Sequence, residues 1–369
     1  MEAFLNDVTI LDVGDEATAL ASELLAELGA NVIRVEDEMG DEIRAQGGHQ
    51  HALLNAGKRS VAINTTTDAG WAPIVELLEA VDVVIGPIEP CPATRRFLDR
   101  AVATITDRPE LGVVDVVFRR IQDPGATPPA TPTPPAESAA RAEPVTDLTL
   151  TAAGGLTWLC GHPDDPPNQP AGDLGWKQIS LAAAEAAMAL IMSNRRAGRG
   201  GHVVISAQEA VALTTLQTAN GNIYHWSKAV PSRDALPAAH TTLASRDGLW
   251  TSFTIHPPNW TRFVEWADEV LGPTGLDGPE WLDLDHVTAN RTVVAGVVGQ
   301  LCASIDRDDL ITQGQARGLL VLPVNEVADI AVDRHLAERQ FWTEAGSTCL
   351  PGSPFRSNLG RGRRRSAPG

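Results

Sequence analysis

The stretch GHPDDPPNQPAGDLGWKQISLAAAEAAMALIMSNRRAGRG, residues Gly161–Gly200, decides the fold of this chain. It starts as a proline-rich loop. It continues from Leu174 to Arg196 as a run of small apolar residues that predicts a long buried helix. Gly198 is expected to end this helix, because glycine readily adopts the left-handed conformation at a helix C-terminus. His202–Ser206 (HVVIS) then predicts a strand, and the succession of loop, long helix and strand indicates an α/β protein.

Strand and helix patterns alternate through the first hundred residues. Asp15 is the expected N-cap of a first helix that ends at Gly29. A parallel sheet with helices on its faces follows from this alternation. The first strand-to-helix turn, DVGDEATA, has one glycine where a dinucleotide-binding fingerprint has three, which argues against an NAD(P) enzyme. The strands are expected at Val8–Val13, Asn31–Glu36, Ser60–Asn64 and Asp82–Ile85, and a further helix at Asp68–Ala80.

The residue composition and the pattern of apolar residues change after Ala239. A Thr/Trp-rich stretch predicts a hairpin that turns at Asp247-Gly248, and amphipathic helices are expected near Asn259–Leu271 and Val293–Ala303. We therefore expect a second, smaller α+β domain. The predicted organisation is a large domain from residues 1–225, a small domain at 226–319, a segment at 320–356 that returns to the large domain, and a disordered basic tail at 357–369. The proline-rich segment 123–144 is expected to be an extended or disordered surface loop.

Composition narrows the classes of partner. The 369 residues are 43% hydrophobic and 21% charged, with a formal net charge of −18, so the chain reads as an acidic soluble protein. Such a surface repels phosphate backbones and anionic lipids, and we expect neither nucleic-acid nor membrane partners. The four cysteines form no C-x-x-C pair, which indicates reduced thiols in a cytoplasmic protein and no metal site.

Several motifs occur in a fixed order between residues 24 and 357. They are LLAELGANVIRVEDEMGDEIR, NAGKRSVAI, the HPDDPP loop followed by GRG, and LPGSPFRS. Together they resemble family III CoA-transferases, the family of formyl-CoA transferase, carnitine CoA-transferase and 2-methylacyl-CoA racemases. The resemblance implies a Rossmann-like large domain built from both chain ends, a smaller α+β domain, and two protomers that interlock as a dimer.

The resemblance also defines where a nucleophile would stand. In this family an aspartate attacks the acyl-CoA thioester and forms a mixed anhydride, then an aspartyl-CoA thioester. The ungapped register from Pro166-Pro167 to the GRG end puts Trp176 at that position, and an indole is no nucleophile. Asp173 is the alternative carboxylate, but a shift of three residues on a helix turns a side chain by about 300° and moves it ~4.5 Å. We therefore expect Asp173 to be the N-cap of the helix.

Basic residues matching the family's coenzyme A contacts are Arg44, Lys58, Arg59 and Arg95. The adjacent pair Lys58-Arg59 is the expected phosphate clamp, because two neighbouring cations neutralise a phosphate well. The alternative is that these four cations pair with the abundant acidic residues of the surface. No cofactor is expected to be bound permanently, and a coenzyme A thioester is the expected substrate or ligand.

Two functional hypotheses follow from these residues. The first is a divergent CoA-transferase-like protein with Trp176 at the nucleophile position, which either transfers acyl groups through Asp173 or another group or is inactive alone. The second is a non-catalytic subunit, or an acyl-CoA-binding partner, of an intact family III CoA-transferase. The expected partners are therefore an acyl-CoA molecule and either a second copy of the chain or a homologous subunit.

Overall fold

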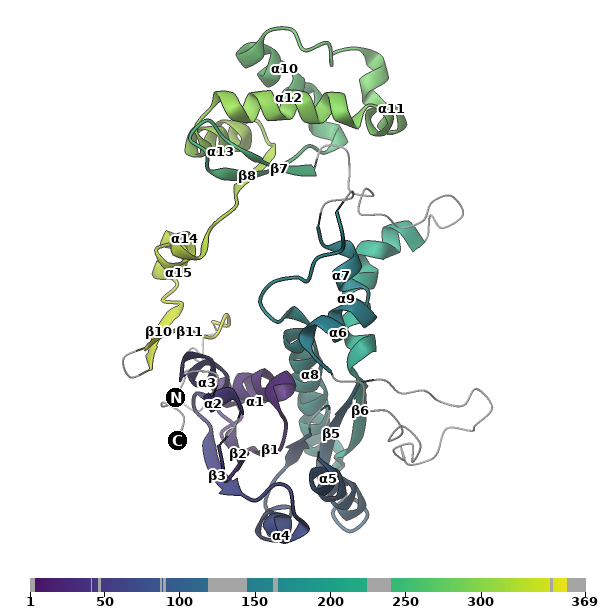
Figure 1. Cartoon of the computed structure of the whole chain (residues 1–369), viewed down its shortest axis with the longest axis vertical. Helices are drawn as coiled ribbons and strands as arrows, with labels where there is room; N and C mark the ends of the chain where they lie inside the picture. Colours follow the sequence, from purple (N-terminus) through teal and green to yellow (C-terminus); the bar gives the residue numbers. More distant parts are fainter. Residues whose placement is uncertain are drawn as a thin grey trace. The chain divides into compact units, whose positions relative to one another are not determined.

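The computed structural model describes residues 4–40, 42–45, 48–86, 88, 91–118, 145–161, 165–223, 240–345 and 348–356. The chain forms two compact units: Met1–Arg233 together with Arg339–Gly369, and Asp234–Glu338 (Figure 1). The first is called unit 1 and the second unit 2. The predicted loop at 123–144 and the tail at 357–369 lie outside the described residues.

Unit 1 is built on a six-stranded parallel sheet with the order β3-β2-β1-β4-β5-β6. This is a doubly wound order, in which the direction of winding reverses between β1 and β4. The structure thus confirms the predicted α/β class and parallel sheet. β5, with the sequence GVVDVV, was missed from the sequence. The strands are β1 (Thr9–Asp12), β2 (Asn31–Asp37), β3 (Arg59–Ile63), β4 (Val83–Ile85), β5 (Gly112–Val117) and β6 (Gly201–Ser206).

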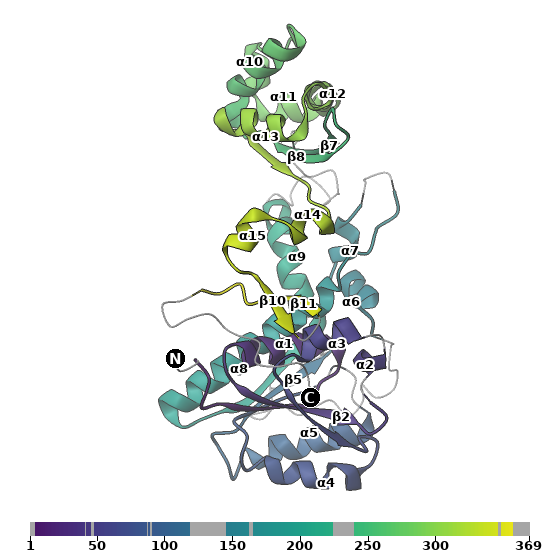
Figure 2. The ribbon, with the colours of Figure 1, turned by 90° about the vertical axis from the view of Figure 1, so that its left-hand side faces the viewer.

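Helices cover both faces of this sheet (Figures 1 and 2). Successive strand residues point to opposite faces, so Ile10 packs into one apolar core and Leu11 into the other. The first core contains α1 and α8, and the second contains α4 and α5. The helices of unit 1 are α1 (Glu16–Glu27), α2 (Glu42–Ala45), α3 (Gly48–Asn55), α4 (Asp68–Leu77), α5 (Pro92–Thr104), α6 (Asp147–Ala153), α7 (Leu156–Leu159), α8 (Leu174–Ala197) and α9 (Ala207–Ile223).

The ends of α1 and α8 agree with the sequence patterns. The Asp15 carboxylate accepts a hydrogen bond from the Ala17 N–H and caps α1 as predicted. Gly29, with φ of +108°, follows its last turn, and Gly198, with φ of +62°, ends α8. The predicted long buried helix is buried on one face of α8, while Leu181 and Met192 on its other side are exposed. That buried face packs closely on α1.

Unit 2 has an antiparallel three-stranded sheet and a layer of helices. The strands are β7 (His240–Ala244), β8 (Trp250–Thr254) and β9 (Leu320–Pro323). The predicted hairpin is confirmed between β7 and β8, and Gly248 in its turn has φ of +80°. The other elements are η3 (Pro257–Asn259), α10 (Trp260–Leu271), η4 (Pro279–Leu282), α11 (Leu284–Ala289), α12 (Arg291–Ser304), α13 (Arg307–Ala316), α14 (Val327–Ala331) and α15 (Arg334–Glu338).

The C-terminal return to unit 1 begins later than the expected residue 320. β9 pairs with β8, and Leu319 and Val321 belong to the core of unit 2, so this unit extends to Glu338. The hairpin of β10 (Trp342–Ala345) and β11 (Thr348–Pro351) belongs to unit 1, where β11 contacts α3. No helix in the described part of the chain is long and apolar enough to cross a membrane.

Candidate functional site

A pocket of about 350 Å³ lies at the carboxyl edge of the unit 1 sheet, beyond the ends of β1, β2 and β4. We call it the edge pocket. In open parallel sheets this edge, at the point where the winding reverses, is where ligands bind. The wall residues discussed below come from several elements and turns, and they are Asp15, Glu36, Trp71, Cys91, Thr94 and Trp176. Among the described residues, no group of three or more His, Cys, Asp or Glu is arranged to hold a metal ion.

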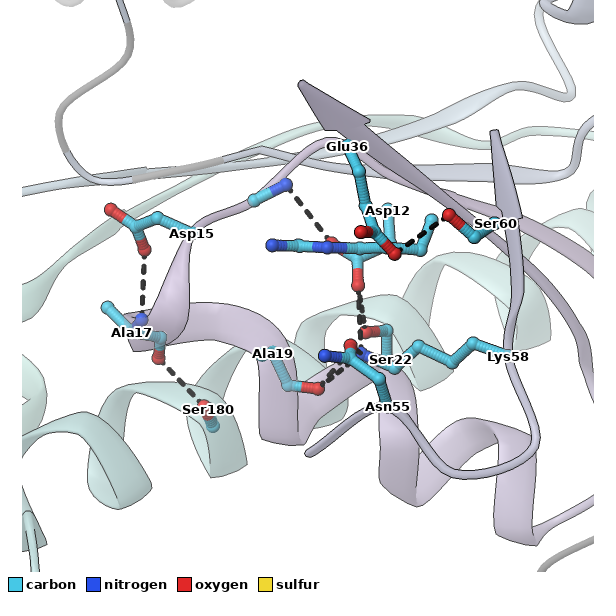
Figure 3. A network of polar contacts seen from close by, with 12 residues as sticks. Asp12, Asp15, Ala17, Ala19, Ser22, Glu36, Asn55, Lys58, Ser60 and Ser180 are labelled. Carbon is cyan, nitrogen blue, oxygen red and sulfur yellow. Dashed lines mark hydrogen bonds and ion pairs between the residues drawn. The ribbon is translucent and has the colours of Figure 1, made fainter. Parts of the chain in front are cut away.

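A buried polar cluster lies behind the edge pocket, centred on Asp12 at the end of β1 (Figure 3). The Asp12 carboxylate accepts hydrogen bonds from Arg34 at 2.8 Å, from Lys58 at 3.0 Å and from the Ser22 hydroxyl. Burial opposes ionisation of Asp12, but the charges of Arg34 and Lys58 hold its pKa well below the ordinary value. We call this group the Asp12 cluster.

Lys58 is fully committed to the Asp12 cluster. Besides Asp12, its ammonium donates to the carbonyl of Ala19 at 2.8 Å and to Asn55 Oδ1 at 2.9 Å. An ammonium has three protons, and these partners use all of them. Arg59 is exposed at the amino end of β3, beside Asn31, so it lies at the opposite edge of the sheet from the pocket. The two residues therefore do not form the phosphate clamp expected from the sequence.

The two other predicted coenzyme A contacts are also engaged in ion pairs. Arg44 binds Glu36 through two hydrogen bonds, at 2.8 and 2.9 Å, and Arg95 binds Asp115 in the same way, at 2.7 and 3.1 Å. Glu36 lines the edge pocket, and the Arg44 side chain remains 39% exposed beside it. Of the four predicted contacts, Arg44 combines exposure with a position next to the pocket.

Trp176 lies in the wall of the edge pocket and is half-buried. Its backbone N–H donates to Asp147 Oδ1 at 3.1 Å. Asp147 is buried at the start of α6, and its other oxygen accepts from Gln169 at 3.2 Å. Gly175 is required here, because a Cβ at that position would come within 2.8 Å of Asp147 Oδ1. The N-terminus of α8 is thus capped by a residue that sequence reasoning did not assign.

Asp173 stands just before α8 but does not cap it through its side chain. Its backbone is left-handed, with φ of +51°, and its side chain makes no capping hydrogen bond. The residue is exposed, and it is not among the described residues that line the edge pocket. The predicted N-cap position is therefore correct, whereas the predicted capping interaction is wrong, and the backbone of Asp173 is left-handed where an ordinary N-cap is extended.

Asp15 lines the edge pocket, whereas the sequence indicated only that it caps α1. Burial raises its pKa to about 6; hydrogen bonding from Ala17 and the charge of Arg34 oppose this rise, and the nearby Asp12 adds to it. A carboxyl that titrates so close to neutrality in a pocket is typical of functional sites. Its position directly after the first strand was the available signal, since carboxyl ends of parallel strands carry the ligand site.

The sequence matches the profile of CoA-transferase family III over residues 5–105 and 135–368, and the chain belongs to this family. It is 26% identical to the subunit BbsE of succinyl-CoA:(R)-benzylsuccinate CoA-transferase from Thauera aromatica, over 94% of this chain and 86% of that protein. It is 24% identical to the alpha subunit of succinyl-CoA–L-malate CoA-transferase from Chloroflexus aurantiacus, over 91% and 77%. It is 27% identical to formyl-CoA:oxalate CoA-transferase from Streptomyces avermitilis, over 96% and 90%.

Solved structures support the fold. A CAIB/BAIF family protein from Brucella suis superposes with a TM-score of 0.81 at 20% sequence identity, over 100% of this chain and 96% of the other. A hypothetical protein from Mycobacterium tuberculosis, Rv3272, superposes with a TM-score of 0.79 at 20% identity, over the same shares of the two chains. The arrangement of helices and strands is therefore that of the CaiB/BaiF proteins.

Proposed function

We propose that this chain is a divergent family III CoA-transferase protein that binds an acyl-CoA thioester and does not complete acyl transfer by itself. The observation that carries the proposal is the indole of Trp176 in the wall of the edge pocket. The ungapped register with the family motif expects an aspartate at this position. Acyl exchange through a covalent intermediate needs a nucleophile there, and an indole offers none.

The proposed role is that of a subunit working beside a homologous chain that carries the aspartate. Two of the relatives, from Thauera aromatica and Chloroflexus aurantiacus, are themselves named as subunits of CoA-transferases. A pair of homologous chains that interlock, as the family resemblance implies, would let one chain bind or orient a ligand while the other performs the chemistry. A homodimer without a partner is the alternative assembly.

Arg44 is the proposed contact to a phosphate of the ligand. Its side chain is 39% exposed beside the pocket, and Glu36 engages two of its five N–H donors, so the guanidinium can also donate to a phosphate. The engagement of Lys58 with Asp12, and of Arg95 with Asp115, speaks against a role for those two cations in direct coenzyme A binding.

Intact-mass spectrometry of the purified chain mixed with succinyl-CoA tests this function. The expected result is no covalent adduct and no transfer with the chain alone, and an adduct on the aspartate-bearing homologue when the two chains are combined. A covalent adduct on this chain that is lost in Asp173→Ala would instead show an active enzyme with a displaced nucleophile. Co-purification of the tagged chain with a second family III protein is the expected assembly result.

The variant Trp176→Asp is the sharper test. We expect the restored carboxylate to give no measurable transfer with the chain alone. Lys58 and Arg95, two of the four cations expected at a family coenzyme A site, are paired with Asp12 and Asp115, so a nucleophile by itself does not restore the family's site. Measurable transfer by this variant would overturn the proposal, because it would show a site intact in every respect but one.

A further inference from the structure

The edge pocket presents acidic groups where a phosphate-binding site would present basic ones. Asp15, Glu16, Glu36 and Asp37 line it, and among the described lining residues Arg34 is the one cation. The Arg34 guanidinium is held by Asp12 at 2.8 Å and is 3% exposed. The charge balance of the wall is therefore unfavourable for the phosphates of coenzyme A, which are the most strongly charged part of that molecule.

The four acidic groups are not equivalent. Glu36 is bound by Arg44, Asp37 accepts from the Thr65 hydroxyl at 2.8 Å, and Glu16 accepts from Gln50. Asp15 accepts a hydrogen bond from the Ala17 N–H at 2.9 Å, through one of its two carboxylate oxygens. Among these four acidic groups of the described wall, Asp15 is the one held by a backbone donor and not by a side chain, and its carboxylate retains acceptor sites for a ligand.

Asp15 and Trp176 belong to the same part of the pocket wall. The Ser180 hydroxyl of α8 donates to the carbonyl of Ala17 at 2.8 Å, which ties the first turn of α1 to α8. Trp176 precedes Ser180 by one helical turn on the same face of α8. Figure 3 shows Asp15 at the beginning of α1, apart from the Asp12 cluster, with Ser180 beneath Ala17. A ligand segment in this pocket would meet a wall that contains both a carboxyl group and an indole.

We propose that Asp15 is a specificity-determining residue of the edge pocket. Its carboxyl accepts hydrogen bonds from the amide and hydroxyl groups of the uncharged pantetheine arm, and it keeps the phosphates of the same ligand outside the pocket. The volume fits this division, because about 350 Å³ is at the small end of the ~300–1,000 Å³ typical of ligand pockets and suits part of a ligand as long as acyl-CoA. The proposal rests on the proposed function, since it takes a coenzyme A thioester as the ligand.

The exclusion of phosphate depends on pH. With a pKa of about 6, Asp15 is ionised at pH 7.5 and neutral at pH 5. The charged groups around it are Asp12, Arg34 and Lys58 of the Asp12 cluster and the three other acidic groups of the wall, Glu16, Glu36 and Asp37. The neighbouring wall residues from α5 and α8, Thr94 and Trp176, do not titrate. The contribution of Asp15 to phosphate exclusion is therefore expected at pH 7.5 and is lost at pH 5.

Isothermal titration calorimetry of the full chain with coenzyme A, and separately with pantetheine, tests this assignment. The variant is Asp15→Asn, which keeps an N-cap for α1 while removing the charge. At pH 7.5 we expect it to bind coenzyme A about tenfold more tightly than the unmodified chain and pantetheine about threefold more weakly. At pH 5 the difference in coenzyme A affinity disappears. Asp15→Ser, with a second capping side chain, is expected to behave in the same way.

The matched control is Asp173→Asn, which removes the same charge from an exposed residue outside the pocket wall. It is expected to change neither affinity. Equal effects of the two variants, or a shift of both ligands in the same direction in Asp15→Asn, would show that Asp15 has no selective role while leaving coenzyme A binding intact. If the unmodified chain binds neither ligand at millimolar concentration, the proposed function fails together with this inference.

Discussion

Asp12 and Asp15 stand three residues apart and behave in opposite ways. The pKa of Asp12 lies well below its ordinary value, while that of Asp15 is raised to about 6. Both are removed from bulk water to a large degree, so burial alone does not distinguish them. The difference is in their partners: two cations and a hydroxyl bind Asp12, whereas Asp15 accepts a backbone N–H and faces a pocket.

The comparison shows what each carboxyl is suited to do. A buried carboxylate whose acceptors are filled stays charged and fixed, and it holds β1, β2 and the start of β3 together. A carboxyl without a cation partner can gain or lose a proton near neutral pH and can accept a ligand. The first belongs to the structure of unit 1, and the second to its chemistry.

The largest effect is expected from breaking the Asp12 cluster with Lys58→Met. Removing one partner of a buried ion pair leaves Asp12 undercompensated, and the free energy of unfolding should fall by about 3–5 kcal/mol. Urea denaturation measures this, with Arg59→Met as the control, which should change it by less than about 0.5 kcal/mol. A Lys58→Met protein of ordinary stability that had lost affinity for coenzyme A would instead restore Lys58 as a phosphate ligand.

The next effect concerns stability in Asp15→Asn. The pKa of Asp15 is raised in the folded state, so its carboxyl favours folding below its ordinary pKa of 3.8 and loses that contribution as pH rises through about 6. The asparagine variant should therefore be more stable than the unmodified chain by up to about 3 kcal/mol at pH 7.5, with no gain at pH 4. Thermal unfolding at the two pH values measures it. A pH-independent difference would contradict the assigned titration.

A smaller effect is expected from Arg44→Ala at the rim of the edge pocket. If Arg44 contacts a phosphate, this variant should bind coenzyme A about fivefold more weakly, or about 1 kcal/mol, while its affinity for pantetheine stays unchanged. Calorimetry with coenzyme A and with pantetheine distinguishes a contact to phosphate, which weakens only coenzyme A binding, from a loss that affects both ligands. The control is Arg96→Ala, which removes an exposed cation paired with Asp68. Equal losses in both variants would mean a general effect of surface charge.

The smallest effect is expected from Asp173→Asn, because Asp173 has neither the partners of Asp12 nor the pocket of Asp15. Asparagine tolerates the left-handed backbone of this position, so the free energy of unfolding should change by less than about 0.5 kcal/mol. The melting temperature of the two proteins should coincide. A loss of more than about 1 kcal/mol would reveal an interaction of the carboxylate that its exposed position does not suggest.

Most of unit 1 follows from local sequence patterns. Strand periodicity located five of the six strands to within one or two residues, and cap chemistry located both ends of α1. β5 was not predicted, although the stretch ITDRPEL with Pro109 separates its run GVVDVV from the preceding helix. The boundary of unit 2 was missed because membership of β9 depends on pairing with β8, far away in the sequence.

The site was less accessible to sequence reasoning. The motif register drew attention to Trp176, which does line the edge pocket. Sequence could not tell that Lys58 is buried against Asp12, since the two residues are 46 positions apart and nothing local predicts their contact. It also could not replace Asp173 by Asp147 as the residue that caps α8, because that bond joins α6 to a helix beyond a long loop.

The sequence by itself determined the family, the parallel sheet of unit 1 and the chemical identity of position 176, because these depend on local periodicity and on side-chain type. Only the tertiary structure decided which charged groups are held in buried ion pairs and which can still contact a ligand. The reason is physical: the charge state and reach of a side chain depend on its desolvation and on partners brought together across the fold. Asp12 and Asp15 are three residues apart in the sequence. Their different neighbours in the fold make Asp12 a structural carboxylate and Asp15 a candidate ligand contact.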